Sequence, residues 1–73
     1  MNLSDRIQYL RKARGISQEG LADQFGVSRQ AVSKWESEQS MPDLDKIISM
    51  SDYFAVTTDY LLKGIEPVVQ KEE

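Results

Sequence analysis

Cysteine and histidine are both absent from this sequence of 73 residues. Without cysteine the chain can form no disulfide and carries no thiolate nucleophile, and without either residue it lacks the usual ligands of a zinc site. The imidazole that most often serves as a catalytic acid or base is missing as well. A chain of this length buries only about 60% of its unfolded surface, which leaves no room for a deep substrate cavity beside the core. We therefore expect a binding module and no enzyme, with no metal and no cofactor.

Long hydrophobic runs are absent too. No segment approaches the roughly 18 apolar residues that a membrane span requires. The opening stretch MNLSDRIQYLRKARG is charged and has no apolar run of the kind found in a secretory signal. We expect a soluble protein of the cytoplasm that has no membrane partner.

Basic residues are scarce. Nine Lys and Arg residues stand against twelve Asp and Glu residues, a net charge of −3, which is the wrong sign for an obvious nucleic-acid binder. The distribution along the chain changes this conclusion, because residues 1–38 carry six cations and five acids, whereas residues 39–73 carry three cations and seven acids. A near-neutral first half with clustered Arg can still neutralise phosphates locally.

Apolar residues spaced by three and four predict five helices, and no stretch alternates with the period of a strand. The expected fold class is therefore all-α. Side chains that can cap a helix mark four of the starts, whereas Pro42 is expected at the first helical position of the fourth helix. The helices are predicted over about 3–14 after Asn2, from Ser17 to Gly26, over about 28–37 with Ser28 as its cap, from Pro42 to Ala55, and from Thr57 to Gly64.

The fourth and fifth predicted helices each show an apolar side. The fifth offers Tyr60, Leu61 and Leu62, of which Leu61 is expected to lie in the core. The fourth is expected to turn inward through Leu44, Ile47, Ile48, Ser51, Phe54 and Ala55.

The segment Gln18–Glu36 has the spacing of two short helices that meet across a tight turn. Such a pair needs a small residue where the helices approach and a residue that tolerates positive φ in the turn, and Ala22 and Gly26 supply them. An ordinary helical hairpin that ends its first helix at Gly26 has the same spacing and stays open as an alternative. The apolar anchors on both sides of the turn are Leu21, Val27, Val32 and Trp35, with Trp35 expected in the core and not as a platform for stacked bases.

The outward side of the second of these helices carries Arg29, Gln30, Ser33 and Lys34. Arg pairs well with guanine and Gln with adenine in the major groove of DNA, because each can form two hydrogen bonds to the base edge. No acid occurs from Ser28 to Ser33, which favours a side presented to phosphates and bases. Ser33 can equally be a small exposed helix residue.

These motifs resemble the Cro/C1-type (XRE-like) helix-turn-helix regulators of bacteria and phages. The resemblance runs from about Ile7 to Gly64 and is carried by S-Q-E, by G-V-S-R-Q-A-V-S-K-W-E and by P-D-L. It implies a compact five-helix, lambda-repressor-like domain whose second helix braces the DNA backbone and whose third helix enters the major groove.

The resemblance also implies roles for individual residues. Arg11 and Glu36 correspond to a structural ion pair that is partly buried in many relatives. The base-reading candidates are Arg29, Gln30, Ser33 and Lys34, and the phosphate-contacting candidates are Ser17, Gln18 and Ser28, for which helix capping alone is the simpler alternative.

Two positions depart from the family pattern. Gly20 stands inside the second predicted helix, where it is expected to weaken the helix by about 1 kcal/mol. Glu38 stands where many relatives have Gly, and the loop ESEQSM lacks the cations that often grip the backbone. Phosphate contacts from Ser37, Gln39 or Ser40 are therefore in doubt.

Together these features predict a sequence-specific DNA-binding transcriptional regulator. We expect a repressor that reads a palindromic double-stranded DNA operator as a homodimer, paired near the fifth helix through residues such as Leu62 and Ile65. The alternative is a protein-interaction module, such as an antitoxin or accessory factor, that uses the acidic second half. Residues 1–64 are expected to form the domain, with the helix-turn-helix at about 17–37, and residues 65–73 a tail or linker.

Overall fold

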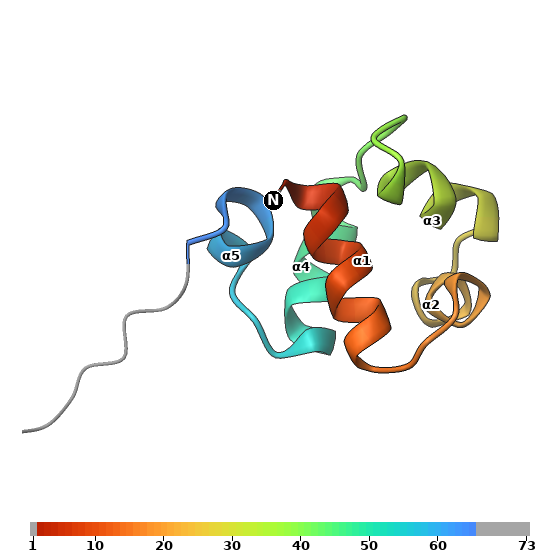
Figure 1. Ribbon diagram of the computed structural model, residues 1–73, viewed down its shortest axis with the longest axis horizontal. Helices are drawn as coiled ribbons and strands as arrows, with labels where there is room; N and C mark the ends of the chain where they lie inside the picture. Colours follow the sequence, from red (N-terminus) through yellow and green to blue (C-terminus); the bar gives the residue numbers. More distant parts are fainter. Residues whose placement is uncertain (1, 66–73) are drawn as a thin grey trace, which may run out of the picture.

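The computed structural model describes residues 2–65, and within that range it contains five helices and no strand. In Figure 1, α1 crosses the middle of the molecule with α4 behind it, while α2 and α3 lie at one end and α5 at the other. The prediction of an all-α fold is confirmed. Apart from Ile65, the predicted tail lies outside the described residues. The helices are α1 (Leu3–Ala13), α2 (Gln18–Phe25), α3 (Arg29–Glu36), α4 (Leu44–Phe54) and α5 (Thr58–Lys63).

A side-chain oxygen caps the N-terminus of each of these helices by accepting a hydrogen bond from a backbone N–H three residues later. The four caps predicted from sequence are confirmed. Pro42 was expected to be the first residue of α4 but instead precedes the N-cap Asp43, because the Asp43 carboxylate accepts from the Lys46 N–H at 3.0 Å and so fixes the start at Leu44. The other caps are Asn2, Ser17, Ser28 and Thr57, with distances of 2.9 to 3.1 Å.

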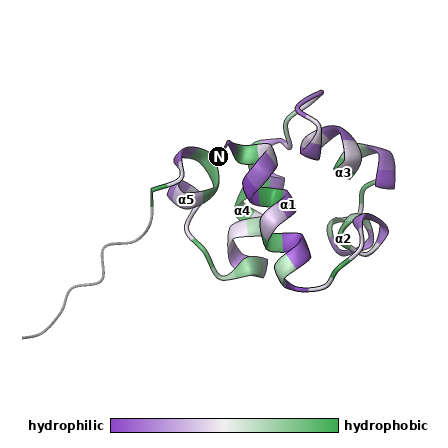
Figure 2. Ribbon diagram, in the orientation of Figure 1, coloured by the Kyte–Doolittle hydropathy of each residue, from purple (hydrophilic) through white to green (hydrophobic). Residues whose placement is uncertain are grey.

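The core is built around α1, which packs against α3 on one side and against α5 on the other, while α5 also packs against α4. Figure 2 shows hydrophobic residues recurring along α1 and α4, while much of α3 is hydrophilic. Trp35 is only 5% exposed, so its predicted place in the core is confirmed, and Leu61 is fully buried as expected. The buried apolar residues are Ile7, Leu21, Ala22, Val32, Trp35, Ile47, Met50, Phe54 and Leu61.

The inward side of α4 differs in part from the prediction. Leu44 and Ile48 are exposed, at 64% and 45%, whereas Met50, which was not predicted, is fully buried. Apolar residues occur on two sides of this helix, so spacing alone could not decide which side faces the core. The prediction that Ala55 faces inward was also wrong, since Ala55 follows the helix and is exposed. The predicted positions Ile47, Ser51 and Phe54 are buried.

Two helices end on a residue other than glycine in the left-handed region. Glu38 has φ of 67° and Ala55 has φ of 58°. After each of them the chain turns back to the helix, with the Gln39 N–H donating to the Lys34 carbonyl at 3.0 Å and the Val56 N–H to the Ser51 carbonyl at 2.9 Å. This is the hydrogen bond of a Schellman ending, which usually has glycine at the left-handed position. Both endings therefore carry backbone strain.

Arg6 connects α1 to α5. It is only 4% exposed, and its Nε donates a hydrogen bond of 2.9 Å to the carbonyl oxygen of Leu61. The end of α5 is closely fitted around it, because a Cβ added to Gly64 would lie 2.9 Å from Arg6 Nη1. The short α5 is thus held to α1 by a buried polar contact as well as by Leu61.

Candidate nucleic-acid interface

A tight turn sets the angle between α2 and α3. Gly26 has φ of 66°, and the Val27 N–H returns to the Ala22 carbonyl at 3.0 Å. Ala22 is buried at 2%, and Val32 and Trp35 anchor α3 in the core. Because these residues fix which side of α3 faces inward, they also fix which side faces solvent.

The structure brings the four predicted base-reading residues together on that outer side. Arg29, Gln30, Ser33 and Lys34 are all exposed. They line one shallow hollow of about 280 Å³, whose remaining lining residue is Gln39. Among residues 2–65 no acid lines this hollow, so its side chains offer hydrogen-bond donors, amide oxygens and positive charge to whatever lies against it.

Gln39 is the residue of this group that sequence reasoning did not place. The spacing of α3 says nothing of the loop beyond it, and Gln39 was named only together with Ser37 and Ser40. The backbone N–H groups of Gln39 and Ser40 both donate to the Lys34 carbonyl, at 3.0 and 3.3 Å. These bonds fold the loop back against the C-terminal end of α3 and hold Gln39 beside Lys34. The signal in the sequence was Glu38 itself, which stands where many relatives have Gly and so indicates a tight turn after α3.

Ser17 and Ser28 stand at the N-termini of α2 and α3. Their hydroxyl oxygens accept from the N–H groups of Gly20 and Ala31, at 2.9 and 3.1 Å, so both residues act as caps. A capping hydroxyl keeps its own O–H as a donor. Since both side chains are exposed, capping does not prevent them from donating to an anion at the positive end of the helix.

Gln18 is held by a buried ion pair. Arg11 donates to Glu36 twice, from Nε to Oε2 at 2.7 Å and from Nη2 to Oε1 at 3.0 Å, and the two side chains are only 10% and 3% exposed. The amide nitrogen of Gln18 donates to the same Oε1 at 3.1 Å. One N–H of the Gln18 side chain is therefore engaged inside the protein, and its second N–H remains for another acceptor.

Gly20 lies in the first turn of α2 and not in its middle. It is the third helical residue, and its N–H donates to the Ser17 hydroxyl. A Cβ at this position would lie 3.1 Å from Ile16 Cγ2 and 3.3 Å from Ser17 Oγ. The expected cost of a glycine inside this helix is therefore offset in part by the crowding that any larger residue would meet.

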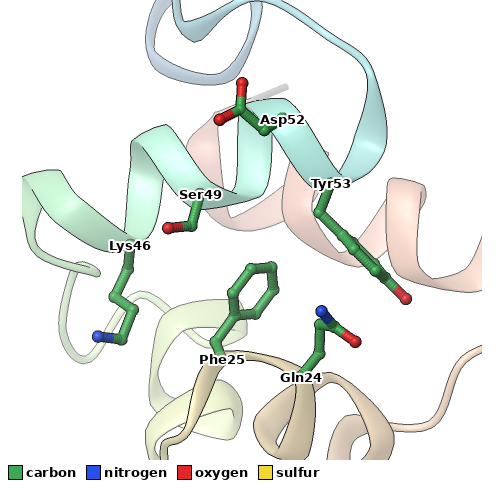
Figure 3. A pocket seen from close by; sticks show the side chains of 6 residues that line it. All are labelled: Gln24, Phe25, Lys46, Ser49, Asp52 and Tyr53. Atoms are coloured by element: carbon green, nitrogen blue, oxygen red, sulfur yellow. The ribbon is translucent and has the colours of Figure 1, made fainter.

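A larger hollow of about 480 Å³ lies between the end of α2 and α4 (Figure 3). Phe25 points toward α4 and meets Tyr53 edge to face, with 5.5 Å between the ring centroids, whereas the Asp52 carboxylate points away from Phe25. Binding pockets place a few polar groups so that they converge on a ligand, and that convergence is missing here. The hollow is also separate from the outer side of α3, and its lining residues are Gln24, Phe25, Lys46, Ser49, Asp52 and Tyr53.

Within residues 2–65, no helix has the length and apolar character needed to cross a bilayer. In the same part of the chain, no three acidic side chains gather where they could ligate a metal ion.

Comparison with known proteins places this geometry in context. The helix-turn-helix family model matches residues 7–61. The HTH-type transcriptional activator BcrR of Enterococcus faecalis is 40% identical over 72 residues, which cover 99% of this chain and 35% of the activator. Repressor protein C2 of Salmonella phage P22 is 36% identical over 62 residues, which cover 85% of this chain and 29% of the repressor. This chain thus spans well under two thirds of these curated relatives.

Solved structures agree with the fold. The P22 c2 repressor, crystallised in complex with a synthetic operator, superposes with a TM-score of 0.82 at 34% identity, covering 89% of this chain and 98% of that one. A transcriptional regulator from Listeria innocua has the same TM-score at 23% identity, covering 96% of this chain and 65% of that one, which shows the shared fold.

Proposed function

Because the chain belongs to the helix-turn-helix family of Cro/C1-type transcriptional regulators, we propose that it binds double-stranded DNA with α3 in the major groove. One observation carries the proposal: the outer side of α3 presents Arg29, Gln30, Ser33 and Lys34 to solvent in one acid-free hollow. The similar P22 c2 repressor, crystallised with a synthetic operator, supports it. The compared relatives carry regulator names, and we propose no catalytic activity for this chain.

The residues of this surface divide by the chemistry of their side chains. Arg29 and Gln30, in the first turn of α3, are the direct base readers, since each can form two hydrogen bonds to a purine. Ser33 and Lys34 lie one turn further along α3, where Ser33 reads a base and Lys34 reaches either a base or a phosphate. Phosphates are contacted from the helix N-termini by Ser17, Gln18 and Ser28, and from the α3–α4 loop by Gln39, which fixes the position of α3 on the duplex.

Homodimerisation on a palindromic operator completes the proposal. One α3 offers few base contacts, and a second copy supplies the missing affinity as well as the symmetry of the site. The exposed apolar residues Leu62 and Ile65, at 40% and 52%, support pairing at the α5 end of the molecule. Leu61 is fully buried and belongs to the core of its own chain.

We further infer that the regulator acts in the cytoplasm and represses by occupying its operator. The name of repressor protein C2 of phage P22 supports repression, whereas BcrR is named an activator, so a reporter gene is needed to test the direction. A reporter gene with the operator placed across its promoter should fall in expression when the protein is present. A rise in expression would contradict repression without contradicting DNA binding.

Selection of binding sequences from randomised duplex DNA, followed by a footprint, tests the function. We expect a palindrome with half-sites about one helical turn apart, roughly 10 base pairs. Failure to enrich any sequence, or enrichment that Arg29→Ala and Gln30→Ala leave unchanged, would contradict the assignment of α3 and favour a role in protein interaction.

A further inference from the structure

Glu38 occupies a backbone position that suits glycine. It follows α3 with φ of 67°, and the two N–H groups after it bind the Lys34 carbonyl. A residue with a Cβ is disfavoured there, because the left-handed conformation brings Cβ close to the following carbonyl oxygen. Because a residue with a Cβ in this conformation lowers stability, its presence suggests that the side chain has a function.

The Glu38 side chain has no partner within residues 2–65. It is exposed, and the described ion pair joins Arg11 to Glu36 instead. The hollow that Glu38 lines, of about 260 Å³ at the start of α1, contains no Lys or Arg among its other lining residues Asn2, Leu3, Ser4, Ser40 and Met41. Within residues 2–65 no cation therefore pairs with this carboxylate, although Glu38 lies at the start of α1, whose N-terminal end favours a negative charge.

The position of Glu38 is next to the proposed DNA-binding surface. Its neighbour Gln39 lines the same hollow as Arg29 and Lys34. The loop from Ser37 to Asp43 carries two acids and no cation. Glu38 itself lines the adjoining hollow at the start of α1. A carboxylate there repels any phosphate that comes within about one Debye length, roughly 10 Å at 0.1 M salt.

We propose that Glu38 limits the affinity of this protein for DNA by repelling the phosphate backbone. The inference rests on the proposed function. Repulsion by a carboxylate acts on every phosphate alike, so it lowers the affinity for all sequences and leaves recognition to the base contacts of α3. Two unit charges about 8 Å apart in water interact strongly enough for a roughly twofold change in affinity.

Glu38→Gln tests the charge while keeping the backbone conformation and nearly the same shape. We expect its affinity to rise by about twofold to fivefold per subunit at low salt. The gain should be equal on a duplex obtained by selection and on a random-sequence duplex, and it should shrink as salt shortens the Debye length. Fluorescence anisotropy titrations of both duplexes at several salt concentrations measure this.

Two glycine variants separate charge from strain. Glu38→Gly should raise affinity as Glu38→Gln does and also raise the melting temperature by about 4–8 °C, the shift expected when strain of this kind is relieved in a small domain. Ala55→Gly relieves the same strain far along the chain, so it should raise the melting temperature and leave the affinity unchanged.

Two results would overturn the proposal. One is an unchanged affinity in Glu38→Gln at low salt. The other is a loss of affinity on the selected duplex alone, which would mean that the carboxylate accepts a hydrogen bond from a cytosine. If the wild-type protein bound neither duplex, the proposed function itself would fail, which is a separate outcome.

Discussion

Arg11 and Glu36 join the last turn of α1 to the last residue of α3 through two hydrogen bonds, 2.7 and 3.0 Å long, across 25 positions of sequence. The guanidinium also donates from Nη1 to the Ile16 carbonyl at 2.9 Å, so it bridges α1, the following loop and α3. The helix proposed to read DNA is therefore held at its C-terminal end by a charge on the first helix. We expect the role of this pair to be structural, namely to fix the orientation of α3.

Replacing Arg11 by Met should destabilise the fold by about 3–5 kcal/mol, because the Glu36 carboxylate would remain buried without its counter-charge. The loss is a large fraction of the stability of a domain of this size, for which about 4–11 kcal/mol is typical. Urea unfolding followed by circular dichroism measures it. The double variant Arg11→Met with Glu36→Met should lose less than Arg11→Met alone. Lys12→Ala, at an exposed position in the same turn, should change stability by at most about 0.5 kcal/mol.

Ala55→Gly should stabilise the protein by roughly 1 kcal/mol, since Ala55 sits at φ of 58° and glycine has no Cβ to strain there. Ala13→Gly is the matched control, because it makes the same chemical change within α1. That variant should lose stability, by less than about 1 kcal/mol because Ala13 is the last residue of α1. Thermal unfolding of both variants shows whether each change raises or lowers the stability. A loss of stability in Ala55→Gly would refute the account of this helix ending.

Arg29→Ala and Gln30→Ala should each weaken binding to the selected operator by about 1–3 kcal/mol and relax the preference for the base that the residue contacts. Lys34→Ala is expected to weaken binding to all sequences more evenly if it contacts phosphate. Gln24→Ala should bind as the wild type does, since Gln24 lines the hollow between α2 and α4. Competition assays with single-base operator variants distinguish these outcomes.

Leu62→Lys should weaken self-association and, with it, operator affinity, because it places a charge on the exposed apolar end of α5. Leu44→Lys makes the same substitution at a more exposed apolar residue of α4, at 64% against 40% for Leu62, and should leave association intact. Sedimentation equilibrium with and without operator DNA compares the two. Dissociation by Leu44→Lys but not by Leu62→Lys would move the interface from α5 to α4.

The salt dependence of binding should be shallow for a DNA-binding domain. Each phosphate neutralised by the protein contributes to the slope of log affinity against log salt, and the first half of this chain carries only six cations against five acids. We expect a slope well below that of about ten released counterions per dimer. A measured release of ten or more would show that the acids lie far from the bound DNA.

The sequence predicts best those features that depend on neighbours along the chain. The caps Asn2, Ser17, Ser28 and Thr57 were all found, because each needs only a side-chain oxygen and an N–H three residues later. The outer side of α3 followed in the same way from Val32 and Trp35. Pro42 shows where such local patterns fail. Proline favours the first helical position, but Asp43 caps the helix instead and α4 begins at Leu44.

Features that depend on distant residues were less accessible. Met50 and Leu44 are both apolar and both belong to α4, and only the packing of other helices decides that one is buried and the other exposed. The hydrogen bond from Gln18 to Glu36 spans 18 positions, so no local pattern reports it. Gln39 reaches the surface of α3 through a loop whose turn depends on Glu38 at positive φ.

The hydrogen bond from Arg6 to the Leu61 carbonyl sets a lower limit on how short a working fragment can be. A version cut before Leu61 would remove the carbonyl that accepts a hydrogen bond from Arg6 Nε. The damage would fall on α1, far from any proposed contact with DNA. Fusions and truncations that aim to transplant the reading helix must therefore carry the chain through α5. The smallest fragment that can be moved into another protein is thus set by the needs of α1, although α1 supplies no proposed base-reading residue.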